Sequence, residues 1–349
     1  MVPVVRDGNS VSSPSALTHV IPATSKRILQ YRLGILGALA IATVLVSWKI
    51  LFPNPELQRI PRVLRFTKLT NDRQLKWYSD SLASDGSRIY FTEMLPGQRT
   101  LILQVPVTGG EAVPLPISLE RPRMLDLSRN GSELLVASEH DSLWAQPVTG
   151  GSARRVGTIA AIDARFGPDG TSIIYTDINE HDVYSVNRDG SSPRKLFTLS
   201  GLSNSFQFSP DGRRLRFTLF DRVLDNMTIM EGAPDGTGLH ELRPGAWGRW
   251  TSDARFFIFQ TRHSRRLDLW ALPEQRHLLR QKSIEQPIQL TAGPMDFFQP
   301  LPSKDGKQIF AVGKTLQAEV VRYDAHTNEF VPYLSGISAV WLSQGMVNG

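Results

Sequence analysis

The stretch that decides the fold is SPDGRRLRFT, residues 209–218. An Asp-Gly turn precedes a run rich in aliphatic and aromatic residues, an order that predicts a tight turn leading into a strand. Similar stretches occupy residues 84–92, 168–176 and 303–311, and weaker ones residues 129–136 and 252–259. The turn residues, spaced 45, 39, 42, 42 and 52 residues apart, are Asp85, Asn130, Asp169, Asp211, Asp253 and Asp305. Such regular spacing indicates an array of repeats.

A second element recurs inside each repeat, as in ILQVPVTGG (residues 102–110) and LWAQPVTGG (residues 143–151). Each repeat therefore contains about four short strands and two turns that carry glycine, with no apolar pattern at helical spacing. We predict an all-β fold, a β-propeller of six recognisable four-stranded blades. Residues 336–342 resemble the first strand of an incomplete seventh blade, and a simple tail over residues 335–349 is the alternative.

These segments resemble the WD40-like (PD40) repeats of TolB-like β-propellers over about residues 66–340. The stretch from Gln289 to Ala339 is similar to the periplasmic propellers of CadC-like membrane-anchored bacterial regulators. The resemblance implies a TolB-like propeller over residues 66–349, and it is weak for biochemical role because propellers serve many functions. Residues 1–30 are too few for the DNA-binding winged-helix head of those regulators, so we predict that this head is absent.

One apolar run, Tyr31–Phe52, stands apart from the repeats. Residues 33–48 carry no charge, and a helix of this length spans roughly 33 Å at about 1.5 Å per residue, enough to cross a bilayer. We predict one transmembrane helix at residues 31–52, a signal anchor, between a flexible cytoplasmic tail (1–30) and a linker (53–65). A buried core helix and a cleaved signal peptide are the alternatives.

The charge distribution bears on partners and on orientation. Residues 1–65 contain eight Lys or Arg and two Asp or Glu, and the remainder contains 31 of each sign, so the whole excess of +6 lies beside the apolar run. No nucleic acid partner is expected, since the repeats are balanced in charge. Basic residues flank both ends of the run, so charge does not decide the orientation. The resemblance implies the inner (cytoplasmic) membrane, with the propeller in the periplasm.

No candidate catalytic, cofactor-binding or metal-binding residue emerges from the sequence. The chain has no cysteine, no Gly-x-Ser-x-Gly elbow and no His-Glu-x-x-His motif. Glu139-His140-Asp141 and Glu180-His181-Asp182 occupy equivalent loops, which we interpret as solvated turns copied by duplication rather than a metal site. The Asp-Gly residues are dispersed around a ring and cannot converge on calcium. Tryptophans at 77, 144, 247, 250 and 270 are assigned to core packing, with an approach to the central channel open for 247 and 250.

Blade topology predicts where a partner binds. The turns between first and second strands and between third and fourth strands share one rim, and the longer loops, such as residues 222–225, share the other. We expect a protein or envelope ligand at the rim with the longer loops or at the channel mouth. We also expect residues 66–70 to be the closing strand of the last blade, and residues 276–285 to be a surface insertion.

Together these features predict a membrane-anchored, non-enzymatic propeller that acts as a binding or sensory module in the bacterial envelope. Two alternatives stay open: a truncated remnant of a CadC-like transcriptional regulator, and a propeller enzyme or hydrolase accessory domain.

Overall fold

The computed structural model describes residues 37, 39, 41–47, 65–70, 75–76, 82–179, 181–221, 226–263, 266–274, 286–292, 295–315 and 321–332. The chain divides into two units, Met1–Ile60 and Pro61–Gly349. In the first unit residues 41–47 are helical. Within the described residues, no helix has the length and apolar character needed to cross a membrane. The predicted tail, most of the predicted membrane helix and most of the linker lie outside the described residues.

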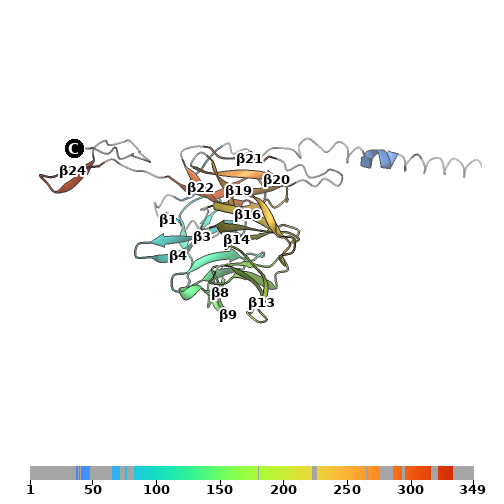
Figure 1. Cartoon of the computed structure of the whole chain (residues 1–349), viewed down its shortest axis with the longest axis horizontal. Helices are drawn as coiled ribbons and strands as arrows, with labels where there is room; N and C mark the ends of the chain where they lie inside the picture. The colour runs from blue at the N-terminus through green and yellow to red at the C-terminus, as the bar shows by residue number, and fades with distance from the viewer. Residues whose placement is uncertain are drawn as a thin grey trace, which may run out of the picture. The chain divides into compact units, whose positions relative to one another are not determined.

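In the described part of the second unit, five antiparallel sheets of at least four strands follow one another along the chain (Figure 1). The first sheet contains β1 (Leu75–Lys76), β2 (Ala83–Ser84), β3 (Arg88–Leu95), β4 (Arg99–Pro106) and β5 (Val113–Pro114). The second contains β6 (Arg123–Leu127), β7 (Glu133–Ala137), β8 (Ser142–Pro147) and β9 (Arg154–Ala160), with the short helix η2 (Glu139–Asp141) between β7 and β8. The third contains β10 (Asp163–Phe166), β11 (Ser172–Thr176), β12 (Asp182–Asn187) and β13 (Arg194–Thr198). The fourth contains β14 (Leu202–Phe208), β15 (Leu215–Asp221), β16 (Asn226–Gly232) and β17 (His240–Pro244). The fifth contains β18 (Ala246–Trp250), β19 (Phe256–His263), β20 (Arg266–Pro273) and β21 (Ile288–Gln289).

The repeated turns form where the sequence predicts them. In the copy at residues 209–214, the Gly212 amide donates to the Ser209 carbonyl at 2.8 Å, and the Asp211 carboxylate accepts from the Arg213 amide at 3.2 Å. Gly212 has φ of 71°, a left-handed conformation that glycine adopts without steric cost. The residue after the turn position has positive φ in all six copies, namely Gly86, Gly131, Gly170, Gly212, Ala254 and Gly306.

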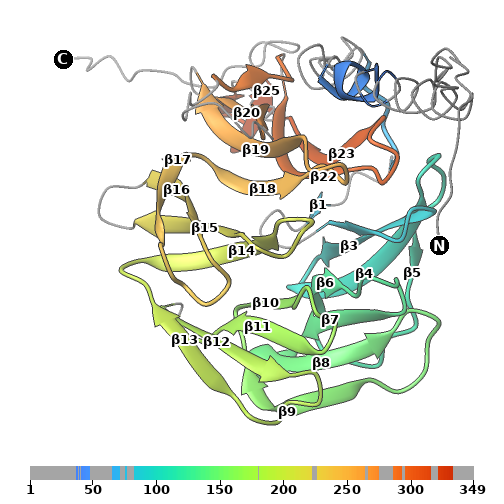
Figure 2. The same cartoon turned by 90° about the vertical axis from the view of Figure 1, so that its right-hand side faces the viewer.

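The sheets are arranged around a centre, and the first strand of each lies on the inner side (Figure 2). Clusters of buried apolar residues join each sheet to the next, which is how a propeller distributes its core. These shared clusters contain Tyr90 with Leu134, Leu135 with Ile173, Ile174 with Phe217, and Ile229 with Phe257. The all-β propeller arrangement predicted from the repeats is therefore confirmed.

The sixth repeat differs from the predicted four-stranded blade. β22 (Asp296–Pro302) and β23 (Ile309–Lys314) form a two-stranded sheet, while β24 (Val321–Asp324) and β25 (Glu329–Pro332) pair only with each other in the described residues. Phe297 of β22 shares a core cluster with the fifth sheet, and Phe310 of β23 shares one with the first sheet. The Lys304 ammonium also donates to the Asp85 carbonyl at 2.7 Å. This small sheet therefore lies between the fifth and first sheets, and a complete sixth blade stays a prediction. The first strand of a seventh blade, predicted at residues 336–342, lies outside the described residues.

The closing strand predicted at residues 66–70 is wrong as a strand, because these residues have no strand conformation. Phe66 instead stacks on Phe297 of β22, with ring centroids 5.1 Å apart. The segment thus reaches the sixth repeat, as expected, but through side-chain stacking. The insertion predicted at residues 276–285 lies outside the described residues.

A feature missed by sequence reasoning is a bulge in the inner strands. Ser205, Trp247 and Gln299, each six residues before a turn position, have φ of 62°, 45° and 52°, and the strand register shifts there in β14, β18 and β22. The amide at this position donates to a side chain of the preceding sheet, and the acceptors include Thr218 for Trp247 (3.0 Å) and Gln260 for Gln299 (3.2 Å). Bulges redirect a strand, and these tie each inner strand to its neighbour.

Candidate binding cleft between two blades

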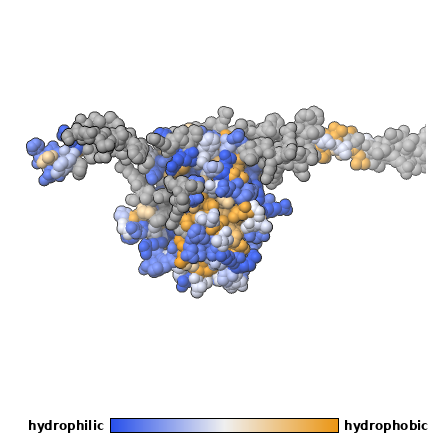
Figure 3. Space-filling model, viewed as in Figure 1, coloured by the Kyte–Doolittle hydropathy of each residue, from blue (hydrophilic) through white to orange (hydrophobic). Residues whose placement is uncertain are grey.

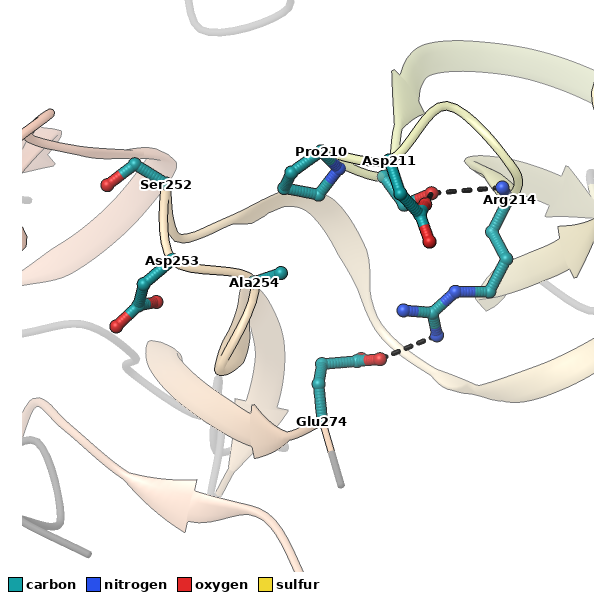
Figure 4. A pocket seen from close by; sticks show the side chains of 8 residues that line it. Pro210, Asp211, Arg214, Ser252, Asp253, Ala254 and Glu274 are labelled. Atoms are coloured by element: carbon teal, nitrogen blue, oxygen red, sulfur yellow. Dashed lines mark hydrogen bonds and ion pairs between the residues drawn. The ribbon is translucent and has the colours of Figure 1, made fainter. Parts of the chain in front are cut away.

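A cleft of about 450 Å³ opens where the fourth and fifth sheets meet (Figure 4). Two walls come from equivalent turns, β14–β15 and β18–β19, and a third from the end of β20. All three segments belong to the rim on which the first-second and third-fourth turns lie, which we call the turn rim. The lining residues are Ser209, Pro210, Asp211, Arg214, Ser252, Asp253, Ala254 and Glu274.

At the base of the cleft, Arg216 of β15 and Arg214, which directly precedes that strand, form ion pairs with Glu231 of β16 and with Glu274, which directly follows β20. Arg216 contacts Glu274 at 2.5 Å through Nη1 and Glu231 at 2.5 Å through Nη2, and its Nε donates to Glu231 at 2.7 Å. Arg214 contacts the same two carboxylates at 2.6 and 3.4 Å. We call these four residues the Arg–Glu box. It joins the fourth sheet to the fifth by charge-assisted hydrogen bonds, which are stronger than neutral ones.

Aromatic rings complete the support of the buried guanidinium. The Arg216 Cζ lies 4.7 Å from the Trp250 ring centroid and 4.5 Å from that of Phe257, both residues of the fifth sheet. A guanidinium over an aromatic face gains energy from the ring quadrupole. Gly248 is required here because a Cβ at that position would lie 2.1 Å from the Phe257 ring. The Arg216 side chain is only 3% exposed, so its carboxylate and aromatic neighbours fix its guanidinium in place at the floor of the cleft.

The two arginines differ in exposure, and only one faces the cleft. The Arg214 side chain is 37% exposed, and its guanidinium points toward Glu274 across the opening (Figure 4). Burial acts to lower the pKa of Arg214, but the neighbouring carboxylates Glu274 and Glu231 outweigh it and raise the pKa. Arg214 is therefore a permanent cation whose remaining donors are available to solvent.

The aspartates on the two turns supply the opposite charge. The Asp211 carboxylate accepts from the Ser209 hydroxyl at 2.5 Å and from the Arg213 amide, which lowers its pKa. Asp253 accepts from the Thr251 hydroxyl at 2.6 Å in the equivalent turn. In both turns one oxygen, Oδ1, makes these bonds. Asp253 Oδ2 also lies 3.9 Å from Arg255 Nη1, so of the two turns it is the Asp211 carboxylate that keeps its second oxygen for a ligand.

The residues singled out by the sequence lie elsewhere. Glu139-His140-Asp141 forms η2 between β7 and β8, while His181 directly precedes β12 and Asp182 is its first residue, so the two segments occupy equivalent positions as predicted; Glu180 lies outside the described residues. No group of three or more His, Asp or Glu able to hold a metal ion is present among the residues that the structure describes. Trp250 and Trp270 pack in the core, in agreement with the sequence analysis, and Trp77 is outside the described residues.

Sequence reasoning missed the Arg–Glu box, although a signal for it was present. Arg216 stands five residues after its turn position, where the other copies have Tyr90, Leu135, Ile174, Ile258 and Phe310. One charge among apolar residues at a buried repeat position requires a buried partner. The partner Glu274 is 58 residues away in sequence, so its identity could not be read from the repeat.

Comparisons with known proteins leave the function open. No protein-family model matches the chain, and no curated protein matches it. Among solved structures, a TolB of Agrobacterium tumefaciens is similar, with 18% identity, a TM-score of 0.48, and coverage of 64% of this chain and 83% of that one. TolB of Acinetobacter baumannii has 16% identity and a TM-score of 0.48, with 59% of this chain and 53% of that chain covered. A structure of a nidogen/laminin complex has 15% identity, a TM-score of 0.45, and coverage of 57% and 76%. Each TM-score lies below 0.5, so the propeller arrangement rests on the observed sheets and their order, and the CadC-like context stays a prediction.

Proposed function

We propose that the chain is a non-enzymatic, membrane-anchored propeller that binds a protein in the bacterial envelope through the cleft between the fourth and fifth blades. The observation that carries the proposal is the construction of this cleft, which lies on the turn rim and not on the rim with the longer loops where the sequence predicts a partner. Its floor is immobilised by the buried ion pairs of Arg216 with Glu231 and Glu274, while the partly exposed Arg214 and the second oxygen of Asp211 lie at the opening. A rigid support below adaptable polar groups is the arrangement expected of a recognition surface.

The size and polarity of the cleft favour a polypeptide segment as the ligand. Its lining carries three carboxylates and one guanidinium, so both charge signs are offered within one opening. A peptide can satisfy both signs with its own side chains and can use the exposed Ser252 region along the turn rim. The surface of the described part of the second unit mixes polar and apolar residues (Figure 3). The cleft is a concave, polar site on this unit.

The anchor is proposed from the first unit alone. The large apolar side chains of its described residues are 58–63% exposed: Leu39, Ile41, Val44, Leu45 and Val46. These side chains are distributed around the helix rather than along one stripe, and they are coloured orange in Figure 3. A helix that is apolar on all sides must be covered by protein or lipid. The charge-free run at residues 33–48 supports lipid.

The anchor predicts that the chain stays in the membrane fraction after alkaline extraction. Deletion of residues 31–52 should release it, because the other charge-free stretches of at least this length, residues 8–25 and 330–349, contain many more polar residues. If the propeller is periplasmic, protease should digest it in spheroplasts and not in intact cells. Full recovery of the intact chain in the soluble fraction would contradict the anchor, and protection of the propeller in spheroplasts would contradict the orientation.

The binding role is tested by filling the cleft. Ala254 already has positive φ (57°), and its side chain lines the opening, so Ala254→Lys adds bulk without removing a side-chain hydrogen bond. We expect this variant to reduce crosslinking to the partner in native membranes, read by mass spectrometry, by about tenfold, equivalent to about 1.4 kcal/mol.

The matched control is Gln308→Lys, which adds the same side chain at an exposed position of the β22–β23 turn. Both variants should unfold at the temperature of the wild type. Equal partner recovery from Ala254→Lys and Gln308→Lys would exclude the cleft as the binding surface. Turnover of a substrate lost in a channel-lining variant would exclude the non-enzymatic role.

A further inference from the structure

Four charged residues of the inner strands meet at the centre of the ring. Asp126 of β6, Arg165 of β10 and Arg249 of β18 each stand four residues before a turn position, and Asp163 precedes Arg165 by two residues. They come from the second, third and fifth sheets, whose first strands face the centre in Figure 2. The charges of Arg165, Asp126 and Asp163 all act on Arg249, so the four groups share one electrostatic environment.

Arg165 and Asp163 are used to hold the sheets together. The Arg165 guanidinium contacts the Asp163 carboxylate at 2.7 Å and donates to the carbonyls of Leu125 and Phe206, the latter at 3.1 Å. Asp163 Oδ2 accepts from the Ser205 and Phe206 amides at the β14 bulge. These bonds connect the second, third and fourth sheets. Both side chains are buried, and their role is structural.

Arg249 has no such role. Among the described residues, its guanidinium takes part in no hydrogen bond and no ion pair, although protein surrounds the side chain and leaves it only partly accessible to solvent. Burial and, to a smaller extent, the charge of Arg165 lower the pKa of Arg249 to about 10, against the opposing effects of Asp126 and Asp163. The group is still charged at neutral pH. A buried charge without a partner is costly, and such an orphan group requires an explanation.

Asp126 does not provide the missing partner. Its Oδ2 accepts from the Phe166 amide at 2.9 Å, and no ion pair joins it to Arg249 within the described residues. Burial raises the pKa of Asp126, despite the lowering effects of Arg165 and the Phe166 amide. The guanidinium of Arg249 therefore keeps donors free for a group that enters from the channel.

We propose that Arg249 binds a carboxylate group of a ligand in the central channel of the propeller, with Arg165 adding positive potential. A guanidinium pairs with a carboxylate through two parallel hydrogen bonds. The nearby carboxyl groups of Asp126 and Asp163 disfavour the binding of a doubly charged phosphate, but they permit the binding of a group with a single negative charge. The carboxylate belongs either to a small organic acid or to an acidic side chain of a protein, and the two sources are separable by experiment. The proposal is independent of the cleft on the turn rim.

The test uses the full chain in detergent and two probes, succinate and a hexaglutamate peptide, in calorimetric titrations at constant ionic strength. Binding of either probe should weaken at least about tenfold in Arg249→Gln. Arg129→Gln, which removes an exposed cation from the turn between β6 and β7, should leave binding unchanged. Binding of succinate alone would identify a small acid, and binding of the peptide alone would identify a protein side chain.

Thermal unfolding separates a ligand site from a structural one. If Arg249 is reserved for a ligand, Arg249→Gln should unfold at the wild-type temperature or higher, because it removes an unpaired buried charge. Arg165→Gln should unfold at a clearly lower temperature. Three results would overturn the proposal: no Arg249-dependent binding of either probe, tighter binding of inorganic phosphate than of succinate, or a loss of stability in Arg249→Gln equal to that in Arg165→Gln.

Discussion

Replacing Arg216 by leucine is expected to lower the free energy of unfolding by about 3–5 kcal/mol. Leucine fills much of the volume but leaves Glu274 and Glu231 without their closest cation, and Glu274 is only 8% exposed. Arg214 cannot replace it, because its contact with Glu231 is already long at 3.4 Å and its side chain lies nearer the surface. The variant also loses the stacking on Trp250 and Phe257. Breaking a buried ion pair from one side is costly because the remaining charge stays desolvated.

Chemical denaturation of the wild type and the variant measures this difference. Arg213→Leu is the matched control, since Arg213 is exposed on the adjacent turn, and it should change stability by less than about 0.5 kcal/mol. Arg216→Lys keeps the charge but cannot reach two carboxylates with a planar fork, so its loss should fall between the two. A loss below about 1.5 kcal/mol for Arg216→Leu would show that the Arg–Glu box does not join the blades.

The turns and strands were predictable because their determinants are local. Gly212 adopts positive φ directly after Asp211, and the strand that follows begins at Leu215, as the repeat indicated. Propensity and turn chemistry act over a few residues, and six copies of the same signal reinforce one another. Even the degenerate copy, with Ala254 in place of glycine, forms the same turn with φ of 57°.

The cleft and the channel cluster were not predictable because their contacts join distant residues. Arg214 and Glu274 are 60 residues apart, and Arg165 and the Phe206 carbonyl are 41 residues apart. The repeat pattern predicts the order of the sheets along the chain. The bulge that shifts the register of an inner strand depends instead on a hydrogen bond to the neighbouring sheet. For the same reason residues 66–70, which have a strand-like sequence, dock through the Phe66 ring.

The inner bulge makes Asp163 the other residue whose loss should be severe. Asp163→Ala is expected to destabilise the fold by about 3–5 kcal/mol, because it removes the carboxylate from Arg165 and the acceptor from the Ser205 and Phe206 amides together. Ser205 has φ of 62°, a conformation that its surroundings must enforce. Without Asp163 nothing described here holds that amide, so the β14 bulge should open.

Denaturation together with amide hydrogen exchange distinguishes this mechanism from a general loss of packing. In Asp163→Ala the amides of β14 should exchange faster than those of the distant first sheet, by more than the global loss of stability requires. Asp163→Asn keeps one acceptor oxygen and should lose about half as much, while Asp189→Ala, on an exposed turn, should lose less than about 1 kcal/mol. Uniform acceleration across all sheets would mean that Asp163 serves the whole ring rather than the bulge. That outcome would also weaken the argument that Arg165 uses its hydrogen bonds and its ion pair to hold the sheets together. The assignment of Arg249 to a ligand depends on that argument.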